Sequence, residues 1–191
     1  VVDGQEVVYK SPQEAEKAGI VFIYQELNVL FDLTVEENLF MGKEITKAFG
    51  VCDKKAMRAK AQEVMDKMGV NIPVNAVMSD LSVGQQQMVE ICKALMVDAK
   101  VLIMDEPTAA LTQPEVEELF KIMNDLKAKG IGMIYISHRM DEITRISDRV
   151  TVMRDGEYVD TVDTATVTKD DIVKMMVGRV IMGDKKAAST V

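Results

Sequence analysis

Short apolar runs that alternate with helical patterns constrain the fold of this sequence most strongly. The runs at 20–24, 101–104 and 132–136 are too short for typical helices and favour buried strands. Helix start signals lie between them, including the capping boxes Ser11–Glu14 and Thr34–Glu37. Strands that alternate with helices predict an α/β core with a mostly parallel sheet.

Helical patterns dominate the stretch 28–97, where they interrupt this alternation. We therefore predict that 28–97 is a helical subdomain inserted into the sheet domain, between 1–27 and 98–178. Within 98–178, Asp155-Gly156 lies between two alternating runs and predicts a β-hairpin. The small, polar stretch 179–191 is predicted to be a linker.

Composition narrows the class of protein. The formal net charge of -8 argues against a nucleic-acid-binding surface, which needs clustered Lys and Arg. The two cysteines, Cys52 and Cys92, lack metal-ligand spacing, and a disulfide framework is not expected, which fits an intracellular compartment. No stretch approaches the roughly 18–20 apolar residues of a membrane span. We expect any membrane role to come through a partner.

Two carboxylates directly follow the apolar run at 101–104. Ligands of open α/β sheets bind at the carboxyl ends of the strands. At such an end Asp105 could hold Mg²⁺ directly or through water, and Glu106 could orient or deprotonate an attacking water. The alternative is a strand that ends in two solvated acids.

Three further signals each have a functional and a structural interpretation. Ser82 and Gly84 open a helix, where free N–H groups and the helix dipole favour an anion, although Ser82 could be only a helix cap. His138, the sole histidine, follows a strand and could donate to a phosphate or a water, or be structural. Gln25 also follows a strand, where its amide could reach a metal or simply face solvent.

The order of these signals resembles the ABC (ATP-binding cassette) ATPases. Gln25 is similar to the Q-loop, 81–85 to the signature, 105–106 to Walker B with the catalytic Glu, and His138 to the H-loop. The run 106–111 resembles the passage into the D-loop. The resemblance implies a P-loop NTPase-like (ABC ATPase) fold, with ATP and Mg²⁺ as cofactors.

The same resemblance implies a role for each site residue. Glu106, His138 and Gln25 would act in catalysis, and Asp105 with Gln25 would hold Mg²⁺. Ser82, Gly84 and Gln85, in the signature, would bind the nucleotide of a partner ATPase domain.

Finer features are similar to the ATP-binding subunits of monosaccharide importers of the ribose, galactose and xylose type. They are the runs 24–28, 85–88, 136–143 and 175–179. Such subunits carry two ATPase domains in one chain, and this sequence resembles the first. The implied partners are a second ATPase domain (in the same chain or a homodimer), transmembrane permease subunits and, indirectly, a sugar-binding protein, with no nucleic acid. The implied location is peripheral, on the cytoplasmic face of the membrane.

Two other functions stay open on the residues alone. A non-transport ABC ATPase of translation or DNA repair is one, although long coiled-coil insertions or basic extensions, which would favour it, do not occur here. A catalytically silent interaction module is the other.

The sequence departs from the family pattern at three places. Val83 replaces the first signature glycine, and Thr112 replaces the D-loop aspartate. No Gly-x-x-x-x-Gly-Lys-Ser/Thr occurs, since Gly42-Lys43 is followed by Glu44. We expect the phosphate loop to lie upstream of Val1, the N-terminal part of the domain to be missing, and this chain alone to be inactive without tightly bound ATP.

Overall fold

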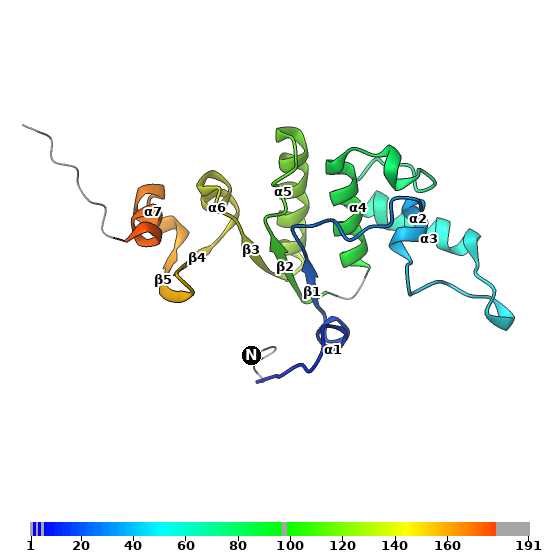
Figure 1. The fold of residues 1–191 in the computed structure, drawn as a ribbon, viewed down its shortest axis with the longest axis horizontal. Coiled ribbons are helices and arrows are strands. Elements are labelled where there is room, and N and C mark those ends of the chain that lie inside the picture. The colour runs from blue at the N-terminus through cyan, green and yellow to red at the C-terminus, as the bar shows by residue number, and fades with distance from the viewer. Residues whose placement is uncertain (1, 3, 5, 97–98, 179–191) are drawn as a thin grey trace, which may run out of the picture. The chain divides into compact units, whose positions relative to one another are not determined.

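The fold is taken from a computed structural model, which describes residues 2, 4, 6–96 and 99–178 (Figure 1). The chain forms two compact units, Val1–Ser137 and His138–Val191, and each is described by itself. The predicted segment 98–178 contributes to both units, and the predicted segment boundaries stay predictions. The predicted linker 179–191 lies outside the described residues.

Three parallel strands form the sheet of the first unit. They are β1 (Ile20–Ile23), β2 (Val101–Asp105) and β3 (Gly132–Ile136), in the order β1-β2-β3. The predicted strands are confirmed, with β1 one residue shorter and β2 one residue longer because Asp105 pairs with Ile136. All three carboxyl ends therefore lie at one edge of the sheet.

The two faces of this sheet differ in their cover. On one face Leu102 and Met104 are fully buried, and Phe120 of α5 (Gln113–Ala128) packs edge-on against Tyr135 with ring centroids 6.2 Å apart. On the other face Phe22, Ile103 and Ile134 form one row in register, with Phe22 39% and Ile134 51% exposed. Parallel sheets are normally covered on both faces, so this row is an unusual apolar surface.

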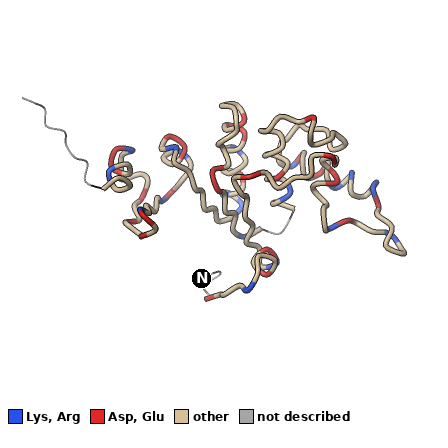
Figure 2. Tube along the Cα trace, in the orientation of Figure 1, with Lys and Arg blue, Asp and Glu red and all other residues tan. Residues whose placement is uncertain are grey.

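Helices fill the predicted helical region, where α2 (Val35–Leu39), α3 (Lys54–Met68) and α4 (Val83–Leu95) pack against one another (Figure 1). The short helix α1 (Pro12–Lys17) precedes β1, and the 3₁₀ turns η1 (Ala48–Gly50) and η2 (Met78–Asp80) flank α3. The apolar faces of α3 and α4 are buried, at Met57, Ala61, Met65, Met88, Ile91 and Cys92. Basic and acidic residues are mixed along this part of the trace (Figure 2).

Of the two predicted capping boxes, Thr34–Glu37 is confirmed and Ser11–Glu14 forms only in part. In α2 the Thr34 and Glu37 side chains cap reciprocally. In α1 the Ser11 side chain accepts from the Glu14 N–H, but the Glu14 carboxylate accepts from Lys10 N–H instead of closing on Ser11. Helix α1 therefore has the bond from the Glu14 N–H to the Ser11 side chain, but it lacks the return bond from the Ser11 N–H to the Glu14 side chain.

The second unit is a hairpin packed on two helices. It contains α6 (Met140–Ile146), β4 (Arg149–Arg154), β5 (Glu157–Asp163), η3 (Thr164–Thr166) and α7 (Lys169–Val177). The predicted turn at Asp155-Gly156 is confirmed, and both residues have positive φ (53° and 81°), as a tight hairpin turn requires. Its buried core is formed by Ile143, Val150, Val152 and Ile172. None of the helices in the described ranges is long and apolar enough to span a lipid bilayer.

Candidate functional site

The carboxyl edge of the sheet brings together three of the predicted site residues. Gln25 follows β1, Asp105 ends β2, and Glu106 comes next, while β1 and β2 are neighbouring parallel strands. Gln25 is exposed, and Asp105 and Glu106 are half-buried. An amide and two carboxylates at one edge, open to solvent, form a site that a polar ligand can approach.

Glu106 has an unusual backbone. Its φ is 45°, in the left-handed region that residues with a side chain rarely adopt. The Glu106 N–H donates to Ile136 O of β3 at 2.9 Å, and the Glu106 carbonyl accepts from Ala109 N–H at 3.1 Å. A strained residue held by its neighbours on both sides is typical of functional sites. The left-handed backbone conformation of Glu106 changes the direction of the chain directly after Asp105, where β2 ends.

The donor set at this edge fits Mg²⁺ only with help from a ligand. Within the described ranges, no group of three His, Cys, Asp or Glu side chains could hold a metal ion by itself. Mg²⁺ commonly uses one or two carboxylates and completes its shell with water and substrate phosphates. Asp105, with the amide oxygen of Gln25 on the neighbouring strand end, satisfies that pattern for a nucleotide-bound Mg²⁺.

The signature residues form the amino end of α4. Ser82 caps the helix: its hydroxyl accepts from Gln85 N–H at 3.2 Å, and Gln85 Oε1 accepts from Ser82 N–H at 3.0 Å. Val83, at the position of the missing glycine, is 48% exposed, whereas Gly84 is buried. Both Ser82 and Gln85 are thus engaged in the cap of the helix.

An acidic residue outside the predicted site lies at this helix end. Ser82 Oγ donates to Glu115 Oε1 of α5 at 3.4 Å. A Cβ placed on Gly84 would overlap the Glu115 carboxylate in its present position, so a larger residue would require that flexible side chain to move. Hydrogen bonds from the Thr112 N–H and hydroxyl, with a smaller contribution from Ser82, lower the pKa of Glu115.

His138 is the first residue of the second unit. It follows the end of β3 by two residues, and it is exposed. Its role beside a nucleotide stays a prediction, as do the roles of the other site residues.

The segment after Gln25 is fastened to two helices by buried polar side chains. Asn38 of α2 is fully buried and bonds Leu30 twice: it accepts from the Leu30 N–H at 2.7 Å and donates to the Leu30 carbonyl at 2.9 Å. Glu90 of α4 is buried and accepts from Asn28 N–H at 3.2 Å. Burial raises the pKa of Glu90, against the opposing effects of the Asn28 N–H and Lys93.

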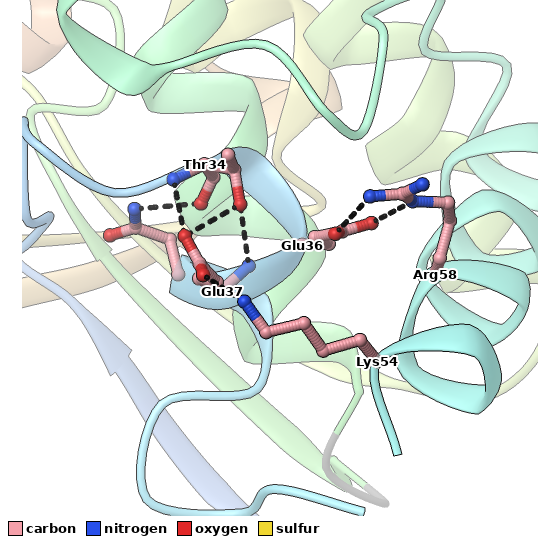
Figure 3. Close-up of polar contacts among 6 residues, drawn as sticks. Thr34, Glu36, Glu37, Lys54 and Arg58 are labelled. Atoms are coloured by element: carbon pink, nitrogen blue, oxygen red, sulfur yellow. Dashed lines mark hydrogen bonds and ion pairs between the residues drawn. The ribbon is translucent and has the colours of Figure 1, made fainter. Parts of the chain in front are cut away.

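Sequence reasoning missed Asn38 and Glu90. The only available signal was a polar residue inside an otherwise apolar helix face. Helix α2 is also tied to α3, because Arg58 donates twice to the buried Glu36 carboxylate, at 2.7 Å each, while Lys54 approaches Glu37 (Figure 3). The segment after Gln25 is therefore held by α2 and α4, and α2 is in turn held to α3.

Comparison with known proteins identifies the family. The model of the ABC transporter family matches residues 1–109. The ribose import ATP-binding protein RbsA of Lactococcus lactis subsp. cremoris is 56% identical over 180 residues, which are 94% of this chain and 37% of that protein. The protein of the same name from Streptococcus agalactiae is 53% identical over 178 residues, 93% of this chain and 36% of the relative. The chain thus spans little more than a third of the length of these relatives.

Solved structures agree with the fold. An ATP-binding cassette of an ABC transporter in its ADP conformation has a TM-score of 0.74 at 28% identity, covering 92% of this chain and 74% of that one. A nucleotide-free ATP-binding cassette has a TM-score of 0.71 at 26% identity, covering 87% of this chain and 71% of that one. The predicted P-loop NTPase-like (ABC ATPase) fold and the resemblance to sugar-import subunits are both confirmed. This chain belongs to the ABC transporter family.

Proposed function

We propose that the chain is part of an ATP-hydrolysing subunit that energises the import of a monosaccharide, with ribose as the first candidate. The observation that carries the proposal is the strained Glu106, which Ile136 holds in place directly after Asp105. Relatives that share about half of the residues are named ribose import ATP-binding proteins, which supports the choice of ribose over galactose or xylose.

The site residues have different proposed roles in ATP hydrolysis. Asp105 and Gln25 hold the nucleotide's Mg²⁺, which supplies positive charge against the phosphates. Glu106 orients the attacking water and accepts its proton, and its fixed backbone keeps the carboxylate aimed. His138 donates a hydrogen bond to the phosphate or to the attacking water.

The signature residues serve a second ATPase domain, in the same polypeptide or in a second copy. Ser82, Gly84 and Gln85 cap the nucleotide that the partner domain holds. This division is what the resemblance to the ABC ATPases implies, and the sequence of the chain contains no Gly-x-x-x-x-Gly-Lys-Ser/Thr of its own. Alone, the chain is proposed to be inactive as an ATPase.

The segment after Gln25 couples ATP to transport. Leu30 and Phe31 are 50% and 48% exposed, although the neighbouring backbone is fixed by Asn38. Apolar side chains displayed on a fixed segment suit a contact with a protein partner. We assign that contact to the transmembrane permease, with the subunit peripheral on the cytoplasmic face and the sugar-binding protein engaged only indirectly.

Uptake of radiolabelled ribose tests the proposal, in cells that make the whole transporter with the polypeptide that contains this chain. Glu106→Gln should lower uptake by about 100-fold or more, as expected for loss of a general base. The matched control is Glu118→Gln, an exposed acid on α5 that loses the same charge. Uptake by the Glu106→Gln transporter at the normal rate would refute the role of Glu106. A whole transporter that takes up radiolabelled galactose or xylose but not radiolabelled ribose would refute the choice of sugar.

A further inference from the structure

A carboxylate from α5 reaches the amino end of α4. Residues 82 and 115 are far apart in the sequence, yet Ser82 Oγ and Glu115 Oε1 are 3.4 Å apart. The carboxylate also fills the space beside Gly84 that a Cβ would otherwise take. Glu115 therefore contacts Ser82 and Gly84, two of the three signature residues that the proposed function assigns to the partner's nucleotide.

The two carboxylate oxygens of Glu115 have separate partners. Oε2 accepts from the Thr112 N–H and from the Thr112 hydroxyl, both at 2.8 Å, and so completes the cap of α5. Oε1 accepts the single long bond from Ser82. The bonds to Thr112 are shorter and local, whereas the bond to Ser82 is near the upper limit for a hydrogen bond. The carboxylate can leave Ser82 without giving up its place on α5.

Charge and space make Glu115 a competitor for an arriving phosphate. The Thr112 bonds lower its pKa, so the side chain is an anion at neutral pH. A helix amino end with a hydroxyl cap favours an anion, and the carboxylate already supplies one. Two anions at one such position repel each other, and the Glu115 carboxylate already takes the space beside the buried Gly84.

We propose that the Glu115 carboxylate is an internal occupant of the signature site, an autoinhibitory contact that a nucleotide phosphate must displace. The proposal rests on the proposed function of Ser82 and Gly84. It gives Gly84 a second purpose, since its missing side chain makes space for the carboxylate in the free state and for the phosphate in the bound state. Closure of the two ATPase domains would then include the movement of Glu115 away from Ser82.

The test compares phosphate binding by the whole 191-residue chain and its variants. Glu115→Gln removes the charge but keeps an acceptor for the Thr112 bonds, because glutamine also occurs at that position of a capping box. Glu117→Gln is the control, an exposed acid two residues along α5 with the same change in charge. Inorganic phosphate is the probe, and the backbone amide NMR signals of Gly84 and Gln85 report on the site.

We expect Glu115→Gln to bind phosphate about five-fold more tightly than the wild type, the equivalent of about 1 kcal/mol for two charges 4 Å apart in water. Glu117→Gln should stay within about two-fold of the wild type, since its charge lies farther from Ser82. In the wild type, saturating phosphate should also raise the pKa of Glu115, followed through its carboxyl carbon signal, because the Ser82 bond is lost. This second measurement needs no variant.

Two outcomes overturn different parts of the inference. Equal phosphate affinity of the wild type and Glu115→Gln, read at Gly84, would overturn the autoinhibitory contact and leave the signature as an anion site. Amide signals of Gly84 and Gln85 that do not respond to phosphate in any of the three proteins would overturn the contact together with the proposed role of Ser82 and Gly84.

Discussion

Replacing Asn38 with alanine should lower the free energy of unfolding by about 3 kcal/mol. The side chain is fully buried and makes three bonds of good length: 2.7 Å from the Leu30 N–H, 2.9 Å to the Leu30 carbonyl and 3.0 Å to the Thr34 carbonyl. Each such bond contributes about 1 kcal/mol net. A fourth contact, to the Leu33 carbonyl at 3.4 Å, adds little, because the amide has only two hydrogens for three acceptors.

Asn38→Asp keeps the shape of the side chain almost unchanged and alters its hydrogen bonds. Aspartate can still accept from the Leu30 N–H, but it loses both donors and faces three carbonyl oxygens with a negative charge. Burial among carbonyls raises the pKa of such a carboxyl in the folded chain. The folded state then binds the proton more tightly than the unfolded state. The loss of stability should be largest at high pH and should shrink as the pH falls through the raised pKa.

Urea unfolding followed by circular dichroism measures the change, with hydrogen exchange of the α2 amides as a local probe, since the chain has two compact units. Asn71→Ala is the control, because Asn71 is exposed in a loop. The reasoning fails if Asn38→Ala costs less than about 1 kcal/mol or no more than Asn71→Ala. It also fails if Asn38→Asp becomes relatively less stable as the pH is lowered.

Four further results are expected. In the native chain a thiol reagent at pH 8 should label exposed Cys52 quickly and buried Cys92 only after unfolding, because burial raises the pKa of the Cys92 thiol to about 12. Labelling of both cysteines at the same rate in the native chain would contradict this. The wild type should be more stable than Glu115→Gln, and this difference should shrink below about pH 4, because a carboxylate whose pKa is lowered on folding stops stabilising the fold once it is protonated. A difference between the two urea midpoints that does not change with pH would contradict this. Light scattering should show self-association that Ile134→Lys reduces, because Ile134 is 51% exposed in an apolar row of the sheet; a strictly monomeric wild type at high concentration would count against it. Calorimetry should find no micromolar binding of Mg-ATP to the chain alone, since the sequence contains no phosphate-loop glycines and lysine, and such binding would refute the expectation.

Sequence patterns predicted the elements whose signals are local. The strands at 101–104 and 132–136 and the turn at Asp155-Gly156 depend on short runs and on turn residues, and all three are found. Parallel strands share their carboxyl edge, so the residues that directly follow them must gather there. Gln25, Asp105 and Glu106 could therefore be placed at one edge from the amino-acid sequence alone.

Contacts between residues far apart in the sequence could not be predicted in this way. The bond between Glu90 and Asn28 spans 62 positions, and neither residue has a pattern that indicates the other. The apolar row of Phe22, Ile103 and Ile134, in which Phe22 and Ile134 are exposed, is another such feature. The residues of this row could be identified only from the register of the three strands. Hydropathy indicates that a strand is buried, but it does not indicate which face of the sheet is left uncovered.

Glu115 shows how a correct local interpretation can leave a residue half explained. The pattern Thr112-x-x-Glu115 predicts a cap of α5, and that cap accounts for one carboxylate oxygen. It leaves the other oxygen free, and free oxygens of helix caps normally face water. Here the other oxygen meets Ser82 because α4 and α5 begin beside each other and Gly84 has no side chain to keep the carboxylate away. The contact therefore depends on the glycine, because the Cβ of a larger residue at this position would push the Glu115 carboxylate out of its present place.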